Sequence, residues 1–239
     1  MRIKLELEPL ERFPYGVVGK HAVQGVIYSR LTGTKFAWMH DNKTFKFFTF
    51  SDIFPSGDFE PGKIKTLLIS SPNEELIETL YEKLQGEETL FLGKHPLKLV
   101  SIKKFSLRPK RRFITGSPIV VRSMKGDGFF TFYHEKSLSY FIKRLTENAI
   151  KKYEAFTGEK APLEGPLFVR MVPKVRKNGW VDVYVRVNIR GEYFDVPGSK
   201  WELLEAEINN KNKRFYSFIM DAGVGELNSL GFGFINPVK

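Results

Sequence analysis

Hydrophobic and polar residues repeat the same succession of periods in both halves of this chain. In the first half, alternating apolar and polar positions predict strands at residues 3–7, 45–50, 63–70, 90–92 and 97–107. Apolar residues that recur every three to four positions predict helices at residues 20–32 and 72–84. The predicted order is therefore β-α-β-β-α-β, which is a ferredoxin-like arrangement.

The second half follows this order less regularly. Strands are predicted at residues 113–122, 129–133, 167–172, 180–189 and 231–235, and helices at residues 137–153 and 214–222. Residues 201–208 fit either a strand or an additional helix, and the pattern leaves both open. The predicted fold class is α+β, with two ferredoxin-like folds in tandem, each similar to an RNA-recognition motif. We place the domains at residues 1–109 and 110–239, the second ending in a glycine-rich loop at 223–233.

Composition narrows the classes of function without choosing one. The chain has 239 residues and no cysteine, which excludes thiolate catalysis, cysteine-bound zinc and disulfides. Its formal net charge is +11, of which +6 lies in residues 1–112 (19 basic minus 13 acidic) and +5 in residues 113–239 (19 minus 14). A basic surface over both halves favours binding to a phosphate backbone. The alternative is a lysine-rich surface with no ligand.

The spacing of the histidines and the length of the apolar runs argue against a metal site and against a membrane span. The four histidines are His21, His40, His95 and His134, and they are scattered without the spacing of a metal site, so we expect no metal and no cofactor. No apolar run approaches the roughly 18 residues of a membrane span, and charges alternate through the N-terminal segment. We therefore expect a soluble, cytoplasmic protein without a membrane partner.

Two short basic segments are candidate contacts for a nucleic-acid backbone. The connector between the predicted domains contains Arg108, Lys110, Arg111 and Arg112. The turn between two predicted strands of the second half contains Lys174, Arg176 and Lys177. At the seam of two RNA-recognition-like folds, such cations would line a cleft for phosphates. The alternative is that both segments are simply solvated.

Two Gly-x-Gly pairs bracket a polar turn near the end of the chain. The segment reads Gly223-Val-Gly225-Glu-Leu-Asn228-Ser229-Leu-Gly231-Phe-Gly233. Glycines at this density allow positive φ and let backbone N–H groups approach an anion, so we expect the loop to contact RNA, with Asn228 and Ser229 at its tip. Ordinary turn chemistry is the alternative. If the loop is a binding element, Gly→Ala at Gly225 or Gly231 lowers RNA affinity more than stability.

This terminal loop and an N-terminal segment resemble one family closely. The loop is similar to that of the repeat-associated RNA-binding proteins of CRISPR systems. The N-terminal segment contains Gln24-Gly-Val-Ile-Tyr28, then His40, then Lys46 six residues further on. Together with the tandem folds, these features resemble the CRISPR-associated endoribonucleases that process precursor CRISPR RNA. The resemblance implies that Tyr28, His40 and Lys46 are catalytic and that CRISPR repeat RNA is the partner. The interval of twelve residues between Tyr28 and His40 is short for the family.

The chemistry expected of these three residues follows from RNA itself. The 2′-hydroxyl beside the scissile phosphate is a built-in nucleophile, so an enzyme has to align it, move two protons and stabilise charge on phosphorus. His40 would protonate the departing 5′-oxygen, and Lys46 would stabilise the phosphorane. Tyr28 is a poor base unless a cation such as Lys46 lowers its pKa, so it either acts as a base or orients the 2′-hydroxyl. No metal is needed, and the products are a 2′,3′-cyclic phosphate (or 3′-phosphate) and a 5′-hydroxyl.

Other functions stay open at this point. A relative that binds repeat RNA without cutting it, or a scaffold subunit of a CRISPR effector complex, would have the same folds. A basic protein that binds duplex DNA or ribosomes is a more distant alternative, and a homodimer is also compatible with the sequence. Each candidate residue also has a structural explanation, with Tyr28 at a helix end, His40 in a loop and Lys46 on a solvated strand face. His21 is the reserve for the acid, and His95 and His134 are assigned to structure.

Overall fold

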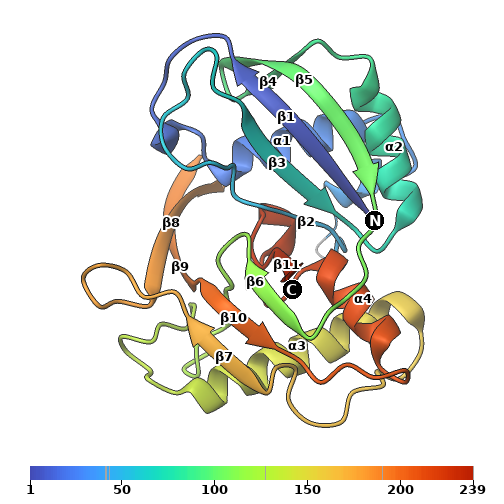
Figure 1. The fold of residues 1–239 in the computed structure, drawn as a ribbon, viewed down its shortest axis with the longest axis vertical. Helices are drawn as coiled ribbons and strands as arrows, with labels where there is room; N and C mark the ends of the chain where they lie inside the picture. The colour runs from blue at the N-terminus through green and yellow to red at the C-terminus, as the bar shows by residue number, and fades with distance from the viewer. Residues whose placement is uncertain (41, 43, 127, 190, 239) are drawn as a thin grey trace.

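A computed structural model describes residues 1–40, 42, 44–126, 128–189 and 191–238. The chain forms two α+β halves, one above the other in Figure 1, joined by a connector between β5 and β6. Each half contains an antiparallel sheet and its own hydrophobic core. The predicted boundary at residues 109 and 110 falls inside this connector and stays a prediction.

The first half has the strand order of a ferredoxin-like fold. Its elements are β1 (Arg2–Pro9), α1 (Lys20–Leu31), β2 (Thr49–Phe50), β3 (Lys65–Ser70), α2 (Glu74–Gln85), β4 (Thr89–Leu92) and β5 (His95–Phe105). The sheet order is β2-β3-β1-β5-β4, with β4 added at the edge as a hairpin partner of β5. Ile3, Leu5 and Leu7 of β1 are buried in the core that α1 and α2 cover, as their alternation predicts.

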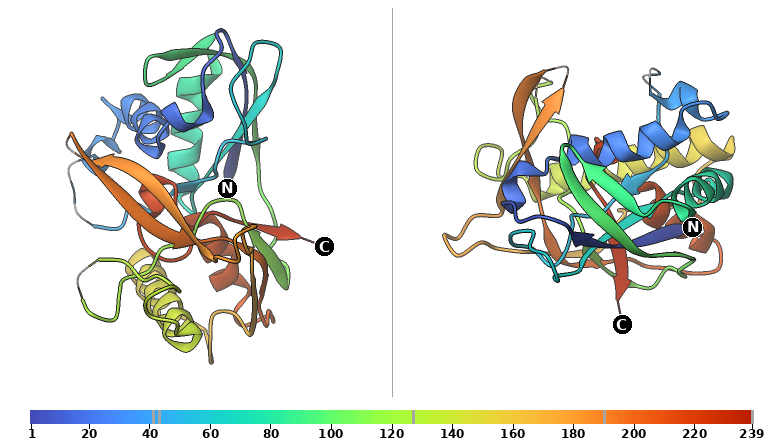
Figure 2. Two further views of the ribbon diagram at one scale, coloured as in Figure 1. Left: turned by 90° about the vertical axis from the view of Figure 1, so that its left-hand side faces the viewer. Right: turned by 90° about the horizontal axis from the view of Figure 1, so that it is seen from above.

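The second half repeats this order with an inserted hairpin. Its elements are β6 (Arg112–Thr115), α3 (Leu138–Thr157), β7 (Arg170–Pro173), β8 (Asp182–Ile189), β9 (Glu192–Ser199), β10 (Trp201–Glu205), α4 (Lys213–Ala222) and β11 (Ile235–Val238). The sheet order is β11-β6-β10-β7, so the tandem ferredoxin-like prediction is confirmed. Figure 2 shows the β8–β9 hairpin reaching from this half toward α1. The open question at residues 201–208 resolves in favour of a strand, β10.

Four predicted strands are wrong in most of their length. The strand predicted at 113–122 ends at Thr115, and beyond it Ile119 and Arg122 form only isolated bridges. Residues 45–48 are not a strand because Phe47 has a φ of 52°, and strand pairing begins only at Thr49. Of the hairpin arm predicted at 129–133, only residues 129 and 130 pair with the preceding segment. The chain then turns, because the carboxylate of Asp182 accepts the backbone N–H groups of residues 132 and 133. The strand predicted at 231–235 begins only at Ile235, after two glycines with positive φ.

The N-terminal ends of two helices lie where their capping residues predict. Asn73 accepts the N–H of Leu76 at 3.1 Å and begins α2. Ser137 accepts the N–H of Tyr140 at 3.2 Å and begins α3. Such side chains satisfy N–H groups that have no partner inside the helix, and each precedes an amphipathic segment. None of the described helices is both long and apolar enough to cross a membrane.

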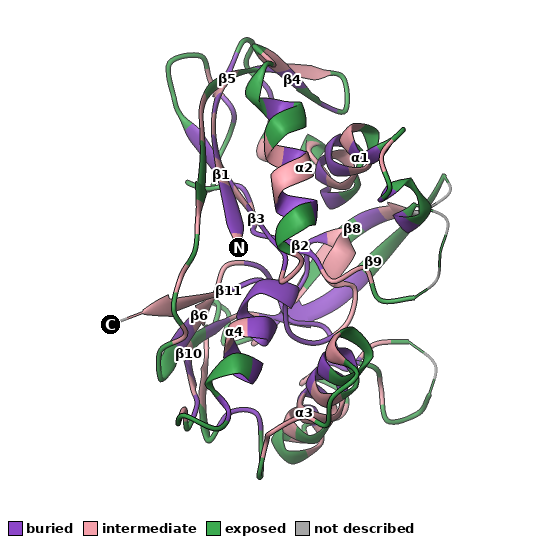
Figure 3. Cartoon of the chain, turned by 90° about the vertical axis from the view of Figure 1, so that its right-hand side faces the viewer, coloured by how far each residue is buried: buried purple, intermediate pink, exposed green. Residues whose placement is uncertain are grey.

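A buried arginine fastens the two halves together. Arg2 of β1 is fully buried, and its Nε donates to Asp221 Oδ1 of α4 at 2.9 Å. Its terminal nitrogens donate to Asn236 Oδ1 at 2.7 Å and to one backbone carbonyl each of α4 and β11, at 2.7 and 3.0 Å. Lys20 of α1 adds a second tie, since its Nζ donates to the carbonyl of Gly231 at 2.7 Å. Figure 3 shows the buried residues continuing from β1 and β3 into α4. The junction therefore holds the glycine-rich loop against the first half.

Candidate functional site

Tyr28 and His40 lie together at the end of the first helix. Tyr28 is in the last turn of α1, and His40 directly follows a short 3₁₀ helix, η2 (Ala37–Met39). Buried Phe36 and Met39 fix this return of the chain, so the two rings meet edge to face with centroids 5.4 Å apart. Both line a hollow of about 410 Å³ that also contains His21. His40 is exposed and Tyr28 is half-buried, so the hollow is accessible to a ligand.

The hydroxyl of Tyr28 is held by the glycine-rich loop. Burial raises the pKa of Tyr28 above its usual value, and a hydrogen bond with the Ser229 side chain opposes that rise to a smaller extent. Gln24, one turn before Tyr28, donates its Nε2 to the carbonyl of Ser229 at 2.8 Å. A tyrosine with a raised pKa stays protonated at neutral pH, which makes it a weak base. Of the two roles expected for Tyr28, orienting a substrate hydroxyl fits this environment.

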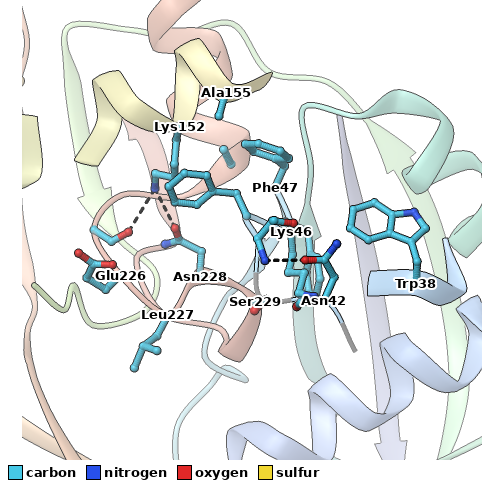
Figure 4. Close-up of a pocket in the computed structure, with 15 residues that line it drawn as sticks. Trp38, Asn42, Lys46, Phe47, Lys152, Ala155, Glu226, Leu227, Asn228 and Ser229 are labelled. Carbon is cyan, nitrogen blue, oxygen red and sulfur yellow. Dashed lines mark hydrogen bonds between the residues drawn. The ribbon is translucent and has the colours of Figure 1, made fainter. Parts of the chain in front are cut away.

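Lys46 lies in the adjoining pocket. Its Nζ donates to the backbone carbonyl of Asn42 and lies over the ring of Trp38, 5.9 Å from its centroid (Figure 4). Ser229 and Phe48 line this pocket of about 700 Å³, and Phe48 packs against Tyr28 with a centroid distance of 5.9 Å. The structure thus places Tyr28 and His40 in one hollow and Lys46 in the next, with Ser229 and Phe48 between them.

The glycines of the loop are packing positions. Positive φ and a blocked Cβ position are common to Gly223, Gly225, Gly231 and Gly233. A Cβ on Gly231 would lie 2.1 Å from Phe50 Cε2, and one on Gly233 would lie 1.9 Å from the carbonyl oxygen of Val224. The crowding atoms belong to the protein itself, so the loop needs glycine in order to fold against β2 and its own backbone.

The N–H groups of the loop are largely used within the protein. Gly223, Gly231 and Gly233 donate to the carbonyls of Ile219, Asn228 and Pro118 at 3.0, 2.8 and 2.7 Å. Our expectation that the glycine N–H groups face phosphates is therefore wrong for these three residues. The loop lies against the first half, where Lys20 Nζ donates to the carbonyl of Gly231.

A buried lysine organises the same loop from the other side. Lys152 of α3 is buried, and its Nζ donates to the carbonyls of Gly223 and Gly225 and to Asn228 Oδ1, the last at 2.8 Å (Figure 4). Burial lowers the pKa of Lys152 to about 7, against a smaller opposing effect of Glu226. Asn228 in turn donates Nδ2 to two loop carbonyls at 3.0 Å each. The Asn228 side chain is thus engaged inside the protein, but it lines the same pocket as Ser229, so the contact of both residues with RNA stays a prediction.

The two basic segments lie on opposite sides of the molecule. The connector residues Arg108, Lys110, Arg111 and Arg112 are exposed along the right edge of Figure 1. The exposed turn with Lys174, Arg176 and Lys177 precedes β8 at the left edge. Arg112 approaches Glu205 at 3.9 Å, and a depression of about 260 Å³ lies beside the connector. The two segments therefore do not form one surface.

Sequence reasoning did not identify Lys152 or Trp38 as parts of the site. The signal for Lys152 was its place on the apolar stripe of the predicted helix, three residues after the buried Ala149. A lysine on a buried stripe is costly unless it has partners, and those partners lie in the distant loop. Among the described residues, no group of three or more His, Asp or Glu side chains is arranged to hold a metal ion.

Comparisons with known proteins agree on one family. A family model described as "CRISPR associated protein Cas6, C-terminal" matches residues 100–237. The chain is 50% identical over 242 residues to the "CRISPR-associated endoribonuclease Cas6 2" of Methanocaldococcus jannaschii, and the match covers all of both chains. A solved structure named "CRISPR associated protein Cas6" superposes with a TM-score of 0.70 at 24% identity, covering 100% of this chain and 99% of the other. Another, "An RAMP protein binding different RNA substrates", has a TM-score of 0.70 at 22% identity and covers 100% of both chains.

Proposed function

This chain belongs to the Cas6 family of CRISPR-associated proteins, and from that premise we propose that it is an endoribonuclease that binds CRISPR repeat RNA and cuts precursor CRISPR RNA. Family membership supports the activity and its substrate class. The observation that supports the site is the meeting of Tyr28 and His40 in one hollow, beside the pocket of Lys46. Each of the three is a residue type that RNA cleavage by the internal nucleophile requires.

In the proposed reaction the 2′-hydroxyl of the RNA attacks the adjacent phosphorus. The bond from O2′ to phosphorus forms, the bond from phosphorus to O5′ breaks, and the proton of the 2′-hydroxyl passes to water. His40, as imidazolium, gives a proton to O5′ and afterwards recovers one from solvent. The products are a 2′,3′-cyclic phosphate and a 5′-hydroxyl, and no metal hydroxide takes part as the nucleophile.

Tyr28 and Lys46 have supporting roles in this proposal. The protonated hydroxyl of Tyr28 orients the 2′-oxygen, because its raised pKa makes it a weak base. The ammonium group of Lys46 lies in the adjoining pocket and stabilises the charge that develops on the phosphorane oxygens. Ser229, hydrogen-bonded to Tyr28, couples the loop to the nucleophile's position. The burial of Tyr28 and the positive charge of Lys46 are therefore the reasons for these two roles.

The test is cleavage of labelled repeat RNA by His40→Ala in the presence of EDTA. We expect the cleavage rate to fall by a factor of about 100 or more, since general acid catalysis contributes roughly 10²–10⁴-fold, with RNA affinity nearly unchanged. His21→Ala is the matched control, because His21 lines the same hollow and has no role in the proposal. Undiminished cleavage by His40→Ala would contradict the assignment of His40 as the general acid. His21 would then be the candidate for that role.

The substrate provides a second, independent check. An RNA with 2′-deoxyribose at the scissile nucleotide has lost the nucleophile, so wild-type protein should bind it and leave it uncut. Cutting of this RNA would mean that water or a metal hydroxide attacks instead. Tight binding of the unmodified repeat without any cutting would favour a non-cleaving relative that delivers RNA to an effector complex.

A further inference from the structure

The pocket beside Lys46 is lined mainly by aromatic rings and other apolar groups. Its walls include Trp38, Phe45, Phe47 and Phe48, around a volume of about 700 Å³ (Figure 4). The Trp38 side chain is 49% exposed and that of Phe45 is 37% exposed. Pockets of a few hundred Å³ with apolar walls and a few polar groups are typical of small-ligand sites. This pocket is large enough for one nucleotide.

A residue with an unusual backbone conformation forms part of the pocket wall. Phe47 has a φ of 52°, which is unusual for a bulky side chain. Its ring packs on Phe156 and Phe218 of the second half, at centroid distances of 5.0 and 6.2 Å. These contacts pack Phe47 at the point where the predicted strand is interrupted, and Phe45 lines the same pocket. Backbone strain that the surroundings maintain is typical of functional sites.

Charges at the pocket divide it into two ends. The ammonium group of Lys46 lies near Trp38 at one end, and Glu226 lies beside Lys152 at the other (Figure 4). A phosphate is attracted to the Lys46 end. At the other end the Lys152 ammonium is buried and donates to three acceptors of the loop, so the half-buried Glu226 carboxylate is the charge that a ligand meets there. A neutral ring with a flat π face fits the aromatic walls. The arrangement therefore suits a nucleobase in the pocket with its phosphate beside Lys46.

We propose that this pocket binds one nucleobase of the RNA next to the cut phosphate, stacked on Trp38. The inference rests on the proposed function for the position of the phosphate, and it adds a subsite that recognises a base. Stacking on an aromatic side chain changes affinity by roughly 5- to 150-fold per base. Because every base has a π face, Trp38 contributes affinity and register more than sequence choice.

The experiment pairs a change in the protein with a change in the RNA. Binding is measured by fluorescence anisotropy with repeat RNA that carries 2′-deoxyribose at the scissile position. Each of the nucleotides flanking the cut is replaced in turn by an abasic nucleotide. We expect one abasic position to weaken binding to wild-type protein roughly 5- to 150-fold, and Trp38→Ala to weaken binding of intact RNA equally. The two losses should not add when combined, because both remove the same contact.

Controls separate this subsite from general effects. Phe91→Ala on β4 removes another exposed aromatic ring, 55% exposed, and should bind as wild type does. Trp38→Phe keeps a stacking face and should restore most of the affinity. A 2-aminopurine at the sensitive position reports stacking through its fluorescence in the wild-type protein, so the test also proceeds if Trp38→Ala does not fold.

Failure of this inference is distinguishable from failure of the proposed function. Additive losses, or affinity of Trp38→Ala equal to that of Phe91→Ala, would overturn the base subsite even if wild-type protein cuts RNA. A protein that shows the non-additive cycle and never cuts would keep the subsite and lose the nuclease assignment. Absence of any repeat RNA binding would overturn both.

Discussion

Two junctions between the halves differ in how their polar groups are used. At the Arg2 junction, a fully buried guanidinium donates to Asp221, Asn236 and two backbone carbonyls of the protein. At the Tyr28 junction, an exposed His40 meets Tyr28 through ring edges, and one hydrogen bond ties Tyr28 to Ser229. At the first junction the guanidinium is buried and its donors are used within the protein, whereas the second presents titratable side chains to solvent. Under the proposed function, the junction that stabilises the fold and the junction that reacts therefore lie at different ends of the same segment.

The segment between these junctions is short. Asp221 is in the last turn of α4 and Ser229 is in the 3₁₀ helix η3 (Asn228–Leu230), with Gly223 and Gly225 between them. A substitution at the Arg2 junction should therefore destabilise the whole fold, and with it the position of Tyr28. A substitution at His40 should change the site and leave the stability of the fold unchanged. The predictions below test this separation.

The largest effect is expected at Arg2. Arg2→Ala removes a buried guanidinium with its hydrogen bonds and leaves Asp221 paired with the N-terminal ammonium of Met1, 2.7 Å away. Removing one partner of a buried ion pair costs about 3–5 kcal/mol, and the Met1 contact places this variant toward the lower value. Urea denaturation would measure the fall in the free energy of unfolding. Arg12→Ala is the control, because Arg12 is 75% exposed and 3.7 Å from Glu60, and exposed pairs contribute only about 0–1 kcal/mol. Equal losses in the two variants would remove the contrast between the junctions.

A somewhat smaller loss is expected at Gly231. Gly231→Ala has to adopt a φ of 79° and place a Cβ 2.1 Å from Phe50, so we expect about 2–4 kcal/mol from left-handed strain and overpacking together. This reverses the order of effects predicted from sequence, where affinity falls more than stability. Thermal melting and RNA titration of the same sample compare the two. Gly16→Ala, where nothing lies within 4 Å, should change neither. A normal melting temperature with lost RNA affinity would restore the binding interpretation.

The lowered pKa of Lys152 should make the stability of the protein depend on pH. Its pKa is about 7 in the folded protein, below the ordinary value of 10.5, so between these values the unfolded chain binds one more proton. Stability should therefore rise with pH in that window, by up to about 1.4 kcal/mol per pH unit. The measurement is the free energy of unfolding at pH 7, 8 and 9 for wild type and Lys152→Met. Lys151→Met, at the exposed neighbouring position, should keep the wild-type slope. Identical slopes for wild type and Lys152→Met would mean that the three acceptors keep Lys152 charged.

The parts of the fold that sequence predicts are those set by local chemistry. Asn73 and Ser137 cap helices that begin next to them, and Tyr28 and His40 are close in space because only a helix end and one short turn separate them. Phe47 escapes prediction because its conformation depends on Phe156, which is distant in sequence and packs on it in space. Alternation alone predicts a strand there.

The same reason explains what sequence missed at the site. The hydrogen bond from Lys152 to Gly223 joins residues 71 positions apart, so no local spacing reveals it. The glycine pattern indicated an unusual loop correctly, but it does not say whether a ligand or the protein occupies the space beside each glycine. Here Phe50 and the Val224 carbonyl occupy that space at Gly231 and Gly233.

The smallest effect is expected at the connector, which belongs to neither junction. Arg108, Lys110 and Arg111 are exposed, so reversing their charges to Glu should leave the free energy of unfolding nearly unchanged. Arg112 stays unchanged in this variant because it faces Glu205 across β6 and β10. If the connector contacts the RNA backbone, each lost phosphate contact flattens the dependence of log K on log salt by about 0.7 for single-stranded RNA. The measurement is repeat RNA affinity across a salt series, with charge reversal of Lys174, Arg176 and Lys177 on the opposite edge as the matched comparison. A slope that changes only in the second variant would place the RNA on the turn before β8, and a slope unchanged in both would exclude both segments as phosphate contacts.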